Sequence, residues 1–131
     1  LDRKLLQIRT PLRITADSYS LSWQEGEWRS GMGRRPDVRE LDALLSALRS
    51  QQVEGIADGD HQRDLAEAEA ELVLQIESLG GTVRLELFTL GERHFINSSE
   101  YPLFYTINAY DYDRLTAIDF RLISGEAHTE Q

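Results

Sequence analysis

The chain has 131 residues, a formal net charge of −9 and no cysteine. That length suits a single domain, which buries roughly two-thirds of the surface that its unfolded chain exposes, so a core can form without disulfides or bound metal. The negative charge argues against nucleic-acid binding, because phosphates attract Lys and Arg. The lack of cysteine excludes disulfides, thiolate nucleophiles and cysteine-based zinc sites.

Charge varies along the chain. Residues 1–35 lean basic, whereas residues 54–77 are strongly acidic, with Arg63 as their one cation. Such a run is usually a solvated surface, and a docking surface for a basic partner is the alternative. No apolar run approaches the ~20 residues of a membrane span. The chain opens on Leu1 rather than Met, so we expect a fragment of a longer chain that is tethered to a membrane only through a segment upstream of Leu1.

The first strand is expected within residues 5–15, where apolar and basic positions mix. Pro11 has no backbone N–H and would remove a ladder hydrogen bond from a central strand, so we expect a strand start or an edge strand there. An exposed edge at Pro11, or at Leu103–Ile107 further on, would let another chain or a second copy add a strand.

A β-hairpin follows. Tyr19, Leu21 and Trp23 alternate with serine, and a turn containing Gly26 leads the chain back into Trp28. This pattern predicts two short antiparallel strands with aromatic side chains on their apolar faces. Tryptophans in this setting more often anchor a hairpin to the core, and a ligand-binding platform is the alternative.

The clearest helix covers residues 37–50. Asp37 is a capping residue, and Glu40 follows three positions later, as in a capping box. Apolar residues recur at spacings of three and four and form one stripe: Val38, Leu41, Leu44, Leu45 and Leu48. We therefore predict an amphipathic helix that packs on one face of the sheet.

Residues 58–64 carry Asp58, Asp60 and Asp64 and come nearest to a metal site. A calcium loop of the EF-hand type needs glycine at its sixth position, but Gly59 falls second. We expect a polar surface loop without a metal, followed by a short helical turn within residues 62–70.

Four strands of an antiparallel meander occupy residues 72–107. Apolar and polar residues alternate along 72–77 and 82–88, which is typical of a sheet buried on one face. Gly80-Gly81 supplies a tight turn between them. Two further strands are expected at 93–96 and 103–107.

The sequence therefore predicts one α+β domain over residues 1–131: an N-terminal β-hairpin plus an antiparallel β-meander, with one amphipathic helix packed on one face. Residues 110–115 are expected to cap or begin a short helix, with Leu115, Ile118 and Phe120 packing back on the domain. Residues 124–131 are polar and are expected to form a frayed tail.

No catalytic constellation stands out in the sequence. His61, His94 and His128 are far apart and lack metal-ligand spacing, and no Gly-x-Ser-x-Gly nucleophile elbow occurs. We expect no enzyme activity, no catalytic residue, no cofactor and no metal.

Aromatic residues are the candidate interaction surface: Trp23, Trp28, Tyr101, Tyr105, Tyr110 and Tyr112. Exposed tyrosine and tryptophan suit protein–protein contacts. Burial along the last strand and its following turn is the commoner fate of such tyrosines.

The order of these segments resembles the domain-of-unknown-function 4340 family. The resemblance rests on the Tyr-x-Leu-x-Trp hairpin, the capped helix Asp37–Ser50, Asp64-Leu65-Ala66-Glu67-Ala68 before the strand Leu72–Glu77, and Leu90-Gly91-Glu92. It covers most of residues 12–115. Related proteins include auxiliary components of gliding-motility-type ABC transporters, usually tethered to the bacterial inner membrane by an N-terminal helix.

The resemblance implies a non-enzymatic, extracytoplasmic domain on the periplasmic side of the inner membrane. Its expected role is an interaction or accessory module for protein partners, such as the subunits of an ABC-transporter-type assembly. The alternative is a small-ligand-binding or hydrolytic domain that uses the tryptophans and tyrosines with a nearby carboxylate.

Overall fold

The structure of the protein is a computed structural model that describes residues 11–125. Its elements follow one another along the chain as β1 Pro11–Thr15, β2 Ser20–Gln24, β3 Glu27–Ser30, α1 Val38–Ser50, β4 Gly55–Ile56, α2 Gly59–Ala66, β5 Leu72–Ser78, β6 Gly81–Leu90, β7 Arg93–Ser98, β8 Phe104–Ile107, α3 Ala109–Thr116 and α4 Phe120–Ile123. The eight strands form one antiparallel sheet in the order β3-β2-β1-β5-β6-β7-β8-β4. The predicted α+β class, hairpin and meander are confirmed.

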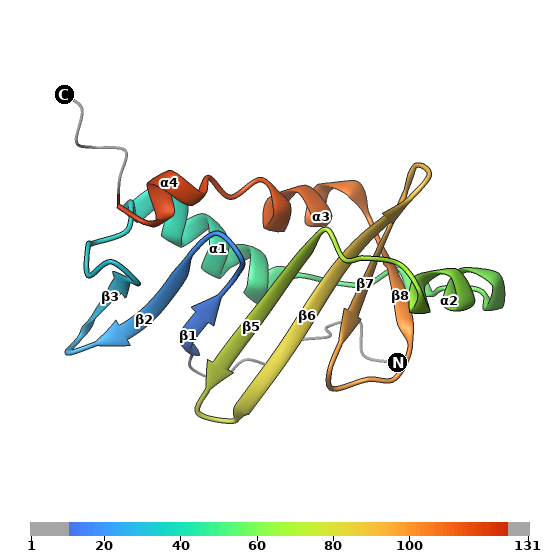
Figure 1. Cartoon of the computed structure of the whole chain (residues 1–131), viewed down its shortest axis with the longest axis horizontal. Coiled ribbons are helices and arrows are strands. Elements are labelled where there is room, and N and C mark those ends of the chain that lie inside the picture. The colour runs from blue at the N-terminus through green and yellow to red at the C-terminus, as the bar shows by residue number, and fades with distance from the viewer. Residues whose placement is uncertain (1–10, 126–131) are drawn as a thin grey trace.

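Three helices cover one face of the sheet. In Figure 1, α1, α3 and α4 lie along the same side, and α1 packs against both of the others. Their apolar side chains join the inward-facing residues of six strands (β1, β2, β5, β6, β7 and β8) in the main core, which includes the fully buried Ile14, Leu44, Leu85 and Ile96. Successive residues of a strand point to opposite faces, so the alternation in β5 and β6 places one row of side chains in this core.

A smaller core lies on the opposite face of the sheet. Leu65 of α2 packs there with Phe88 and Phe95, which neighbour main-core residues in their strands and therefore point the other way. Figure 1 shows α2 at the β8 end of the sheet. The predicted single covering helix is thus one of several, and the two ends of the sheet are covered differently.

The structure corrects the predicted sheet edges. β1 pairs with both β2 and β5, so it is an interior strand and the predicted edge strand at Pro11 is wrong. Residues 5–10 lie outside the described part. β8 is interior too, because Gly55–Ile56 pairs with it as β4. Strand addition at Pro11 or at Leu103–Ile107 is therefore wrong for this fold.

The edge strand β3 is partly covered. Ser30 N–H donates to Arg34 O at 2.8 Å, and Ser30 O accepts the N–H of Gly33 at 2.9 Å. The loop after β3 therefore satisfies the outward-facing backbone groups at that end of the edge.

Two further predictions fail at loops. Asp58–Asp64 is not a surface loop, because Asp58 caps α2 and the following residues are helical. Ser124 is not frayed: it is 7% exposed and caps α4, while residues 126–131 lie outside the described range. Within residues 11–125, no helix is long and apolar enough to span a membrane.

Candidate functional site

The two tryptophans meet at the tip of the β2–β3 hairpin. Glu25 and Gly26 form the two-residue turn, both with positive φ, which places Trp23 directly opposite Trp28. Their ring centroids are 5.8 Å apart, edge to face at 72°. Trp28 packs partly against the main core, whereas Trp23 is 47% exposed. One ring thus anchors the hairpin and the other reaches solvent.

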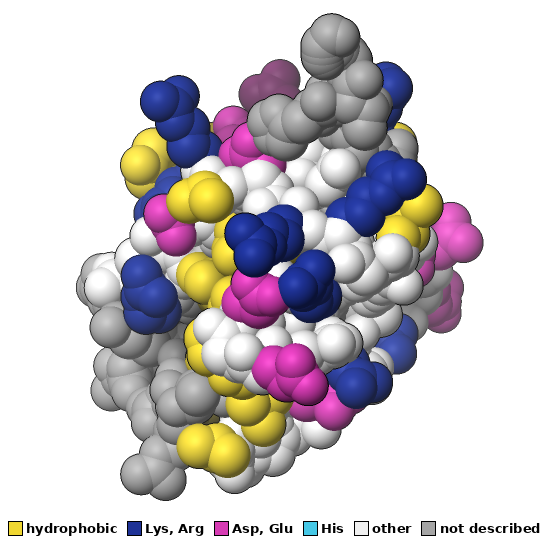
Figure 2. Space-filling view, turned by 90° about the vertical axis from the view of Figure 1, so that its left-hand side faces the viewer, with side chains coloured by type: hydrophobic (Ala, Val, Ile, Leu, Met, Phe, Trp, Pro, Cys, Tyr) yellow, Lys and Arg dark blue, Asp and Glu magenta, His cyan; other side chains and the backbone are white. Residues whose placement is uncertain are grey.

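Charged side chains surround this pair. Glu27 forms ion pairs with Arg29 and with Arg35, the latter at 3.4 Å. We call Trp23, Trp28, Glu27, Arg29 and Arg35 the hairpin surface. Figure 2 shows that this side of the molecule carries arginine, acidic and hydrophobic side chains interspersed. Tryptophan and arginine, both present on the hairpin surface, are enriched in protein–protein interfaces.

The four candidate tyrosines do not form one surface. Tyr101 and Tyr110 are 37% and 70% exposed, but Tyr105 and Tyr112 are buried. Tyr101 contacts Tyr105 edge to face at 6.3 Å, and the guanidinium of Arg114 lies 5.4 Å from the Tyr110 ring. The prediction of an exposed contact surface therefore does not hold for Tyr105 and Tyr112.

Tyr112 instead belongs to a polar cluster that the sequence did not reveal. Thr89 Oγ1 lies 2.9 Å from Glu71 Oε1, 3.0 Å from the Tyr112 hydroxyl and 3.0 Å from His94 Nδ1. The Tyr112 hydroxyl also donates to Glu71 Oε1. The His94 and Tyr112 rings stack at 4.1 Å. We call Glu71, Thr89, His94 and Tyr112 the α3 polar cluster.

One proton arrangement satisfies this cluster. Thr89 has a single hydroxyl proton and the Glu71 carboxylate only accepts, so Thr89 and Tyr112 both donate to Glu71 while His94 Nδ1–H donates to Thr89. Thr89 and His94 lie opposite each other in β6 and β7. The tight turn at Gly91 joins these two strands, so this pairing can be predicted from the sequence. Glu71 and Tyr112 join them only through the tertiary fold.

A cavity of about 300 Å³ opens beside Glu71. Asp17 and Glu71 supply its carboxylates, and Leu72, Leu115, Ile118 and Phe120 supply its apolar wall. The predicted alternative needed a pocket that joins the aromatics to a carboxylate. The structure brings Tyr112 to Glu71, but Trp23 and Trp28 do not line this cavity.

Tyr19 forms another part of the cavity wall. It is 8% exposed, and its hydroxyl has no hydrogen-bond partner within the described residues. Burial, with a smaller effect from the nearby Glu40 carboxylate, raises the pKa of Tyr19 to about 12. Its phenol therefore stays protonated at neutral pH.

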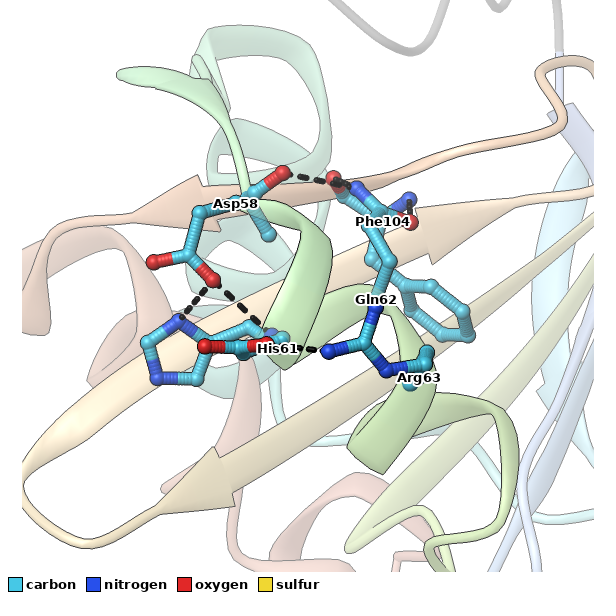
Figure 3. A network of polar contacts seen from close by, with 7 residues as sticks. Asp58, His61, Gln62, Arg63 and Phe104 are labelled. Atoms are coloured by element: carbon cyan, nitrogen blue, oxygen red, sulfur yellow. Dashed lines mark hydrogen bonds and ion pairs between the residues drawn. The ribbon is translucent and has the colours of Figure 1, made fainter.

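The carboxylates at the start of α2 interact with other residues of the same helix (Figure 3). Asp58 accepts the N–H of His61 at 2.9 Å and lies 3.1 Å from His61 Nδ1. The backbone hydrogen bond from His61 is the main reason that the pKa of Asp58 is lowered. Asp60 pairs with Arg63. Within residues 11–125, no group of three or more His, Cys, Asp or Glu side chains is placed to hold a metal ion.

Comparisons of the chain with protein-family models, with curated proteins and with solved structures find no match. The resemblance to the domain-of-unknown-function 4340 family therefore stays a prediction. The candidate site rests on the geometry of the hairpin surface and of the α3 polar cluster.

Proposed function

We propose that this chain is a non-enzymatic protein-interaction domain that contacts its partner through the hairpin surface. The observation that carries the proposal is the half-exposed Trp23, held edge-on against Trp28. A rigid aromatic side chain that is already ordered loses little conformational entropy on binding, and tryptophan and arginine are the residues enriched at the energetic centres of interfaces.

The ion pairs of the hairpin surface suit the same role. Glu27 holds both Arg29 and Arg35 in place before a partner arrives, and Arg29 also donates to Gly33 O at 3.2 Å. Preorganised charges of both signs favour a partner with a complementary pattern of charge. They do not favour a uniformly anionic polymer.

The resemblance to membrane-tethered auxiliary proteins supports a location and a partner for this domain. In that proposal it lies on the periplasmic side of the inner membrane and docks onto a subunit of an ABC-transporter-type assembly. Finding the full-length protein wholly in the soluble cytoplasmic fraction would contradict this location.

Site-specific photo-crosslinking in cells tests the proposed surface. A photoreactive residue at position 23 is compared with one at Leu79 and one at Tyr110, which are 72% and 70% exposed and lie elsewhere on the molecule. We expect a discrete adduct from position 23 alone, identified by mass spectrometry and lost when Arg35 is replaced by Glu. Equal adducts from all three positions would refute the hairpin surface as the docking site.

A further inference from the structure

The cavity beside Glu71 lies at the ends of interior strands of the sheet, between three segments that are distant in sequence. The turn from β1 to β2, the start of β5 and the connection from α3 to α4 form its walls. Figure 1 shows these three segments on the same side of the molecule, at the same ends of the strands. Its volume of about 300 Å³ is at the lower end of the range for small-molecule sites.

The charges of the cavity are unbalanced. Asp17 and Glu71 both line it, and no cation among residues 11–125 forms an ion pair with either carboxylate. Glu71 uses Oε1 to accept from Thr89 and Tyr112, and no described residue donates to its other side-chain oxygen. That second oxygen is oriented by the α3 polar cluster and remains an open acceptor.

Much of the rest of the wall is apolar, although Ser18 and Thr116 also line the cavity. Leu72, Leu115 and Ile118 pack against the main core from the cavity side, and Phe120 is 49% exposed at its rim. Tyr19 adds a nearly buried phenol whose hydroxyl has no hydrogen-bond partner among residues 11–125. Two acceptor groups set in an apolar wall recognise a ligand that has one cationic end and one apolar body.

We propose that this cavity binds a primary ammonium group carried on a small apolar body. An ammonium ion has three donors that point in different directions, which suits carboxylates on separate segments together with the hydroxyls of Ser18 and Thr116. A guanidinium prefers one carboxylate in a planar, bidentate pair. The site is independent of the hairpin surface, so either proposal stands or fails alone.

The ammonium group has two sources, a free small amine or a lysine side chain of a partner protein. Benzylammonium represents the first and Nα-acetyl-lysine amide represents the second. Benzyl alcohol has nearly the same shape as benzylammonium without its charge and serves as the ligand control. Binding of one cation and not the other identifies the source of the ammonium group. In either case the cation must bind more tightly than benzyl alcohol.

The test is a titration of the whole 131-residue chain followed by ¹H–¹⁵N NMR. Glu71→Gln and Asp17→Asn each remove one charge, and the glutamine keeps an oxygen that accepts from Thr89 and Tyr112. Glu69→Gln makes the same chemical change two residues away on an exposed side chain that does not line the cavity.

We expect shifts confined to the amides of residues 16–19, 71–72 and 115–120. The dissociation constant should rise about fivefold in Glu71→Gln and in Asp17→Asn, which is typical of losing one partly solvated charge contact. It should not change in Glu69→Gln. Equal binding of benzyl alcohol, equal weakening by Glu69→Gln, or the absence of localised shifts with both cations would overturn the proposal.

Discussion

The side-chain amide of Gln62 binds both backbone groups of Phe104, although 42 residues separate them. Its nitrogen donates to Phe104 O at 2.8 Å, and its oxygen accepts the N–H of Phe104 at 3.0 Å. The same nitrogen donates to Ala57 O at 3.0 Å. Beyond the end of β4, the Gln62 side chain therefore makes the hydrogen bonds to β8 that a neighbouring strand would make. These bonds attach α2 to the edge of the sheet.

Gln62→Leu should destabilise the domain by about 1–2 kcal/mol, because Phe104 N–H and Ala57 O each lose their Gln62 partner at roughly 1 kcal/mol, whereas Phe104 O still accepts the N–H of Ala57 at 3.0 Å. Urea unfolding measures the loss, and faster hydrogen exchange of the Phe104 amide locates it. Arg63→Ala, one residue along the same helix, is the control; its exposed pair with Asp60 contributes about 0–1 kcal/mol. Equal losses in the two variants would contradict this role for Gln62.

The buried phenol of Tyr19 should make stability depend on pH in the alkaline range. Its folded pKa of about 12 exceeds the value near 10 in the unfolded chain, so its contribution is complete below about pH 10. That contribution is lost as pH rises from about 10 to 12, by about 2–3 kcal/mol in total. Tyr19→Phe should remove this part of the pH dependence, measured by urea unfolding at several pH values.

Below pH 10, Tyr19→Phe should unfold at a higher urea concentration than the unmodified chain. The replacement removes a buried hydroxyl that has no partner within the described residues and keeps the ring. Tyr110→Phe changes a 70% exposed side chain and should leave both the midpoint and the alkaline pH dependence unaltered. An unchanged alkaline slope in Tyr19→Phe would mean that another group causes it.

The α3 polar cluster should behave as a coupled unit. Thr89→Val and Tyr112→Phe each remove a hydroxyl that contacts Glu71 Oε1, and each should cost about 1–2 kcal/mol. Because the two hydroxyls also lie 3.0 Å apart, the double variant should differ from the sum of the single losses by at least about 0.5 kcal/mol. Thr82→Val, exposed on the same strand, is the control. Strict additivity would show that the hydroxyls act separately.

Gln51 is expected to limit the stability of the protein. Its side chain is 1% exposed, and neither its amide nitrogen nor its amide oxygen has a hydrogen-bond partner in the described part of the chain. Gln51→Met keeps a similar shape without the amide and should stabilise the domain by about 1–3 kcal/mol. Gln52→Met alters the exposed neighbour and should have little effect. A destabilised Gln51→Met variant would point to a water molecule that satisfies the amide.

Local patterns in the sequence determined the secondary structure well. Asp37 caps α1 as predicted, because its side chain accepts the N–H of Glu40, only three residues away. The turn at Glu25-Gly26 and the turn before Gly81 set the register of their hairpins. When the residues of a cap or a turn are only a few positions apart, the local sequence is enough to predict that cap or turn.

Contacts between distant segments were decided only by the tertiary structure. Glu40 looked like half of a capping box, yet its carboxylate accepts the N–H of Asp119, 79 residues later, and the N–H of Asp37 donates to Leu122 O. The two-residue strand β4 is too short to leave a periodic pattern, and it exists because β8 offers it an edge.

The same distinction between local and long-range contacts applies to the candidate site residues. The Thr89–His94 pair is local to one hairpin, but Tyr112 reaches Glu71 only after α3 packs on the sheet. Tyrosine has an apolar ring and a polar hydroxyl and occurs both on surfaces and in cores. The residue type alone therefore does not predict whether a tyrosine is buried. The hairpin tryptophans are predictable from the sequence, whereas the cavity arises only where three distant segments meet, with two carboxylates that form no ion pair within residues 11–125.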